Sequence, residues 1–68
     1  MNKHAFNAAV KYFGSQGKLA RAMGINPMTV SQWKRKGMPA IRAAQIERLT
    51  NGKVTRAELL PEIFGKTV

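Results

Sequence analysis

The sequence has no cysteine, a single histidine and only three acidic residues among its 68 residues. No disulfide can therefore stabilise the fold, and a structural zinc site lacks its usual thiolate and imidazole ligands. The same scarcity leaves no combination of nucleophile, base and orienting group, so we expect no catalytic residue, no metal, no cofactor and no small-molecule substrate. The lack of cysteine is also consistent with a reducing cytoplasm.

Long apolar segments are also missing. No apolar run is longer than the three residues at 8–10, whereas a membrane span or a secretory signal peptide needs a much longer one. We therefore expect a cytoplasmic protein that makes no membrane contact. Hydrophobic residues still make up 44% of the chain. This content allows one small core, so residues 1–68 are predicted to form a single domain.

Positive charge is the most informative feature of the composition. The chain carries 12 Lys and Arg residues and a net charge of +9, and all three acids lie after residue 46. Residues 1–46 therefore hold a charge of +8, and residues 47–68 hold +1. A small domain with this asymmetry is expected to bind a polyanion with its N-terminal two thirds. The alternative is a solvated basic surface that only aids solubility.

Glycine and proline divide the chain into short segments whose apolar residues recur with a helical period. Asn26 and Pro27 suit the N-cap and the first position of a helix, and Thr55 with Glu58 forms a capping-box pattern. Pro61 is a candidate for a kink in the last helix. The pattern predicts an all-α fold of five short helices, at about residues 3–13, 16–23, 27–36 and 39–50 and after residue 55.

The middle of the chain has the spacing of a helix-turn-helix. Two short helices can cross steeply only if a small residue allows close approach, and Ala20 is such a residue. Gly24 can adopt the positive φ that the turn requires, and Ile25 can fill the corner behind it. Val30 and Trp33, three residues apart, can hold one side of the second helix in the core. The joint match favours a helix-turn-helix over a generic helical hairpin with a tight turn.

Several segments carry a resemblance to a known family. They are Phe13-Gly14-Ser15-Gln16, Leu19-Ala20, Met23-Gly24-Ile25, Val30-Ser31-Gln32-Trp33, Ile46-Glu47 and Glu58-Leu59-x-Pro61-x-x-Phe64-Gly65. With them the chain resembles the Cro-type repressors of phages and prophages, and especially the YdaS-like branch of small helix-turn-helix proteins. The resemblance implies a lambda-repressor-like, all-α domain that represses by blocking polymerase at a promoter, in a bacterial cell or a phage-infected bacterial host. Some Cro proteins replace the C-terminal helices with a β-hairpin, but the helical pattern of residues 39–64 favours the all-α kind.

The predicted helix-turn-helix unit spans about residues 16–36. Its second helix has an exposed face opposite its two core residues. Four residues on that face are predicted to contact bases in the major groove: Met28, Ser31, Gln32 and Arg35. Met28 suits a thymine methyl group, Gln32 a bidentate contact with adenine, and Arg35 a guanine or a phosphate. Ser31 can donate a hydrogen bond to a base or accept one from it. The alternatives are an extra core contact for Met28 and a solvated polar face for Ser31 and Gln32.

Contacts with the DNA backbone follow from the same geometry. The first helix of the unit crosses the phosphates, and its N-terminus suits an anion. Such contacts fix the register of the protein on DNA without selecting a sequence. The residues predicted to make them are Gln16, Lys18, Asn26, Thr29, Lys34, Lys36 and Arg42.

Apolar residues near the C-terminus have two interpretations. In so small a chain most of Leu59, Leu60, Ile63 and Phe64 are expected to close the core. The remainder could form a patch for a second copy, because operators of this class are usually pseudo-palindromic and are bound by two-fold dimers. The expected partners are therefore double-stranded DNA with a pseudo-palindromic operator and a second copy of the chain, which could join in solution or only on DNA.

The pattern within residues 39–50 predicts a core stripe of Ala43, Ile46 and Leu49. Ile41 lies off this stripe, and no neighbour is predicted for it. His4 is expected at the surface without a role.

Other functions fit the sequence less well. A membrane-active or general polyanion binder would need one broad basic amphipathic helix, whereas the basic residues here are spread over several short helices. The serious alternative is a transcription activator or an antitoxin-like regulator with a protein partner, because it would share the same DNA-contacting residues. Some relatives in the YdaS-like branch are described as antitoxins.

Overall fold

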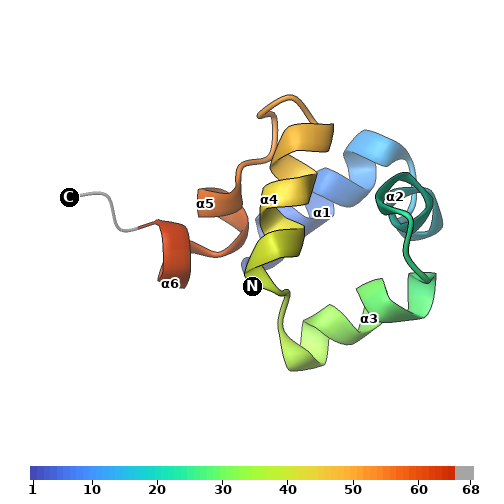
Figure 1. Ribbon diagram of the computed structural model, residues 1–68, viewed down its shortest axis with the longest axis horizontal. Helices are drawn as coiled ribbons and strands as arrows, with labels where there is room; N and C mark the ends of the chain where they lie inside the picture. Colours follow the sequence, from blue (N-terminus) through green and yellow to red (C-terminus); the bar gives the residue numbers. More distant parts are fainter. Residues whose placement is uncertain (66–68) are drawn as a thin grey trace.

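Helices make up the fold of residues 1–65, which are the residues that the computed structural model describes. Within that range there is no strand, so the all-α prediction is confirmed. Figure 1 shows α3 along one edge of the molecule, below α2, with α5 beside α4 and α6 beyond α5 on the left. No helix among these residues is long and apolar enough to cross a membrane. The helices are α1 Lys3–Phe13, α2 Gln16–Met23, α3 Pro27–Lys36, α4 Ala40–Leu49, α5 Arg56–Leu59 and α6 Pro61–Phe64.

Local sequence explains where α2 and α3 begin. Ser15 Oγ accepts a hydrogen bond from the Lys18 N–H (3.1 Å) at the start of α2. Asn26 Oδ1 accepts one from the Met28 N–H (2.8 Å) at the start of α3. These side chains satisfy N–H groups that a helix cannot pair internally. The N-terminal ends of α2 and α3 are therefore set by their own caps, as the sequence predicts for α3.

The core is built from one face of each of the helices α1 to α5. Val30 and Trp33 are 0% and 4% exposed, so the predicted inner side of α3 is confirmed. Ile25, from the turn before α3, is half-buried and packs against this core. The buried apolar residues are Phe6, Ala9, Leu19, Ala20, Met23, Val30, Trp33, Met38, Ala43, Ile46, Val54, Leu59 and Leu60.

The inner stripe of α4 differs from the predicted one at its last position. Ala43 and Ile46 are fully buried, but Leu49 is 37% exposed and Thr50 is 0% exposed. The helical period places residues three and seven positions after Ala43 on the core side. Thr50 is accommodated because its hydroxyl donates to the Ile46 carbonyl (2.9 Å) and accepts from the Val54 N–H (3.1 Å). The prediction of Leu49 was therefore wrong.

The predicted last helix is two short helices, so residues 1–65 form six helices instead of the expected five. Leu60 leaves the helical region with φ −128° and ψ 69°, and Pro61 opens α6. Proline at position 61 disfavours a helical conformation for the residue before it, which explains the break. Leu60 is buried with Leu59, whereas Ile63 is 55% exposed.

Thr50→Val tests the buried hydroxyl. Valine keeps the shape of threonine but leaves the Val54 N–H without its partner inside the core. We expect a loss of about 1–3 kcal/mol in the free energy of unfolding, measured by urea denaturation followed by circular dichroism. Thr29→Val on the half-buried side of α3 is the matched control and should change stability by less than about 0.5 kcal/mol. Equal stability of Thr50→Val and the wild type would contradict this account of the α4 end.

Candidate nucleic-acid interface

The α2–α3 unit is held by the turn at residues 24–26. Gly24 adopts the left-handed conformation with φ 72°, which glycine allows without a steric penalty. The Ile25 N–H donates to the Ala20 carbonyl (3.0 Å) and closes the end of α2. Ala20 is fully buried, as close approach of the two helices requires. The turn thus fixes the direction in which α3 leaves α2.

The outer face of α3 presents the four predicted base-contacting residues to solvent. Ser31, Gln32 and Arg35 are exposed. Met28 is 70% exposed, so it is not an additional core residue. With Val30 and Trp33 buried, the helical period leaves this face free along the whole helix. It carries an apolar group, a hydroxyl, an amide and a guanidinium, which are groups that can contact base edges.

One hydrogen bond joins two predicted site residues from different helices. Gln16 Nε2, at the first position of α2, donates to Ser31 Oγ on α3 (2.6 Å). The hydroxyl proton of Ser31 stays available, because its oxygen is the acceptor in this contact. Gln16 therefore connects the predicted phosphate-contacting helix to the predicted base-contacting face. Sequence spacing alone did not indicate this pair.

The predicted phosphate-contacting residues lie in different environments. Lys18 and Lys36 are exposed, and Thr29 is half-buried. Asn26 is exposed, but its side-chain oxygen is engaged as the cap of α3. Lys34 Nζ lies 5.8 Å from the centre of the Phe6 ring, so its ammonium group is directed over α1.

Arg42, in the first turn of α4, is half-buried and bound to a neighbour that the sequence did not single out. Its Nη1 donates to Gln45 Oε1 (2.7 Å), and Gln45 Nε2 donates to the Met23 carbonyl at the end of α2 (3.1 Å). Gln45 has no motif around it, and its backbone partner lies 22 residues away in the chain. No local pattern could have indicated this contact.

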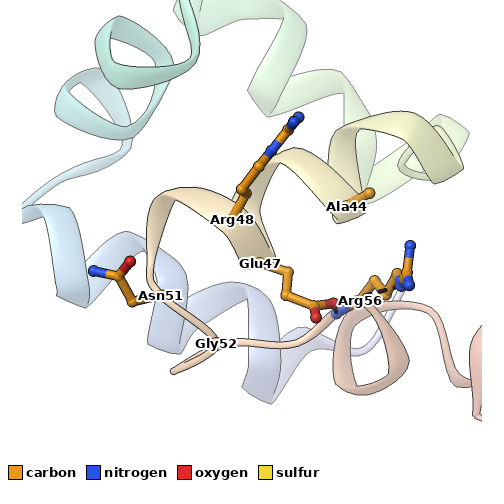
Figure 2. A pocket seen from close by; sticks show the side chains of 6 residues that line it. All are labelled: Ala44, Glu47, Arg48, Asn51, Gly52 and Arg56. Carbon is orange, nitrogen blue, oxygen red and sulfur yellow. Dashed lines mark hydrogen bonds and ion pairs between the residues drawn. The ribbon is translucent and has the colours of Figure 1, made fainter.

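A separate hollow of about 540 Å³ lies between α4 and α5. Figure 2 shows Glu47 and Arg56 turned toward each other there, while Arg48 and Asn51 point elsewhere. Glu47 Oε1 accepts a hydrogen bond from the Arg56 N–H (2.9 Å) and lies 3.6 Å from its Nε. The only acid in the hollow therefore supports the start of α5.

A tightly turned helix pair whose second helix is seated by two buried residues and exposed on its outer face defines the helix-turn-helix class. Comparison with known proteins agrees with this class and narrows it. Residues 6–68 match the family model described as bacterial toxin YdaS. The chain belongs to the YdaS family.

Named relatives connect this family with phage regulation. The chain is 39% identical over 62 residues to the transcriptional regulator YdaS of Escherichia coli strain K12, covering 88% of this chain but 63% of that protein. It is 34% identical over 58 residues to the regulatory protein cro of Pseudomonas phage D3, covering 82% and 80% of the two chains. Its fold is similar to that of the Cro protein from the prophage element Xfaso 1 of Xylella fastidiosa strain Ann-1, with a TM-score of 0.81, 40% identity and coverage of 97% and 100%. The chain is thus related to phage-type regulators.

Proposed function

We propose that the protein is a transcriptional repressor of Cro type that binds double-stranded DNA sequence-specifically, with α3 in the major groove. The observation that carries this proposal is the exposed face of α3, whose Met28, Ser31, Gln32 and Arg35 lie opposite a firmly buried side. A helix that is seated in this way can present side chains to base edges without rearranging. Repression follows if the bound protein covers a promoter.

Base contacts are assigned from the chemistry of each side chain. Gln32 can bind adenine through both amide groups, and Arg35 can bind guanine or a neighbouring phosphate. Ser31, which accepts from Gln16, keeps a proton to donate to a base acceptor. Met28 can pack on a thymine methyl group. The basic and polar residues around this face would hold the phosphates and fix the register.

A homodimer is the form that fits a pseudo-palindromic operator. Two copies related by a two-fold axis place their α3 helices in successive major grooves, about 34–36 Å apart. The copies could associate in solution or only on DNA. Ile41 and Ile63, 76% and 55% exposed, are apolar residues outside the core.

Salt dependence tests the electrostatic part of the proposal. If about four to six phosphates are neutralised per subunit, log K against log salt should have a slope of roughly −4 to −5 per subunit. Fluorescence anisotropy with a labelled duplex, at salt concentrations from about 50 to about 300 mM, measures this slope. Lys36→Ala should reduce its magnitude by about one on every sequence tested. Binding that does not change with salt would contradict a phosphate-contacting surface.

The alternative function is that of a transcription activator or of an antitoxin-like regulator with a protein partner. The matching family model is described as a toxin, so an effect on cell growth is also tested. A reporter gene downstream of the bound site separates a repressor from an activator, because repression lowers its output and activation raises it. Slow growth caused by binding to a specific DNA site should be weaker in Gln32→Ala, because this variant loses base discrimination. Growth inhibition that persists in this variant would favour a protein target.

A further inference from the structure

Gln45 links the helix-turn-helix to the C-terminal helices. Its Nε2 donates to the Met23 carbonyl at the end of α2 (3.1 Å), and its Oε1 accepts from Arg42 Nη1 (2.7 Å). Within residues 1–65 this is the only hydrogen bond between α2 and any of the helices α4 to α6. Met23 is the last residue of α2, so its carbonyl has no partner within the helix.

Both partners impose the same orientation on the Gln45 amide. A carbonyl oxygen can only accept, so the NH₂ group must face Met23, and a guanidinium can only donate, so the amide oxygen must face Arg42. Neither a carboxylate nor an ammonium group could satisfy both sides. The side chain type at position 45 is therefore matched to this pair of neighbours.

The neutral amide also preserves the charge of Arg42. A carboxylate at this place would pair with the guanidinium and compete with a phosphate, whereas an amide oxygen orients it and leaves further N–H donors free. Arg42 follows α3, whose last turn carries Lys34, Arg35 and Lys36. It can therefore extend the basic surface of α3 onto α4.

We propose that Gln45 is a positioning residue that holds Arg42 for a DNA phosphate and fixes it relative to the helix-turn-helix. This inference rests on the proposed function, because it gives that DNA interface a fixed contact from α4. It predicts that the contributions of residues 42 and 45 to DNA binding are coupled.

A double-mutant cycle tests this coupling on the full chain. Arg42→Met should reduce the magnitude of the salt slope by about one per subunit. Gln45→Met, which removes both hydrogen bonds at similar side-chain length, should weaken binding about 3–10-fold in the wild type and less than about 2-fold in the Arg42→Met background. Arg48→Met removes the same charge from the exposed side of α4 and should leave the slope unchanged.

Gln45→Glu provides a second, independent readout that does not depend on the folding of Gln45→Met. Its carboxylate keeps an acceptor for Arg42 but neutralises it, so the salt slope should fall as in Arg42→Met. Equal weakening by Gln45→Met in both backgrounds would overturn the inference, as would an unchanged slope in Arg42→Met or Gln45→Glu. A wild type without salt-dependent DNA binding would overturn the proposed function, and this inference with it.

Discussion

Trp33→Ala is expected to remove most of the free energy that holds the protein folded. Trp33 is 4% exposed and lies in the core beneath the outer face of α3. Truncating a buried tryptophan costs about 3–5 kcal/mol, and a domain of this size has a total stability of about 5 kcal/mol. The loss should appear as a much lower midpoint, or as no cooperative transition, in thermal denaturation followed by circular dichroism.

Met28→Ala is the matched control for this experiment. It also shortens a large side chain on α3, but Met28 is 70% exposed. Its unfolding midpoint should stay close to that of the wild type, because surface substitutions usually change stability by less than about 0.5 kcal/mol. A Trp33→Ala protein that folds cooperatively with an unchanged midpoint would show that α3 is not held by this residue.

Gln32→Ala should relax the sequence preference of the protein at one position of each half-site. The exposed amide of Gln32 is the group best suited to a bidentate contact with adenine. Its loss should remove about 1–3 kcal/mol of discrimination at that position, and the effect doubles on an operator with two half-sites. Competition binding with duplexes that differ at single positions measures this change.

Lys36→Ala is the comparison for Gln32→Ala, since both residues are exposed on α3. Loss of a phosphate contact should weaken all sequences to a similar degree, because phosphates carry no sequence information. Gln32→Ala should therefore change the sequence preference, whereas Lys36→Ala should lower the affinity for all sequences. If both lost affinity uniformly and kept the wild-type preference, the proposed orientation of α3 on DNA would be wrong.

Local patterns predicted the elements that depend on neighbouring residues. Asn26 caps α3 through its own side chain, and Gly24 has the positive φ that the turn needs. Both features are determined within a few residues, so the sequence carries them directly. The same holds for the Thr55–Glu58 capping box. The helix-turn-helix was therefore predictable before any tertiary contact was known.

Two features of the structure were not predicted from the sequence pattern. Thr50 is buried because it bonds to Ile46 and Val54, while a polar residue at a helix end usually suggests exposure. Gln45 meets the Met23 carbonyl across 22 residues. For Gln45, packing between helices decides the environment, and no local pattern records it.

Selection of bound duplexes from a random pool at about 150 mM salt tests the central claim most directly, since non-specific electrostatic binding is weakened there. We expect enrichment of an inverted repeat whose half-sites are separated by about one helical turn, or 10 base pairs. Such a site would establish sequence-specific recognition by two copies. A pool that shows no enriched sequence, with binding that disappears as salt rises, would contradict recognition by α3 and leave only a basic helical surface.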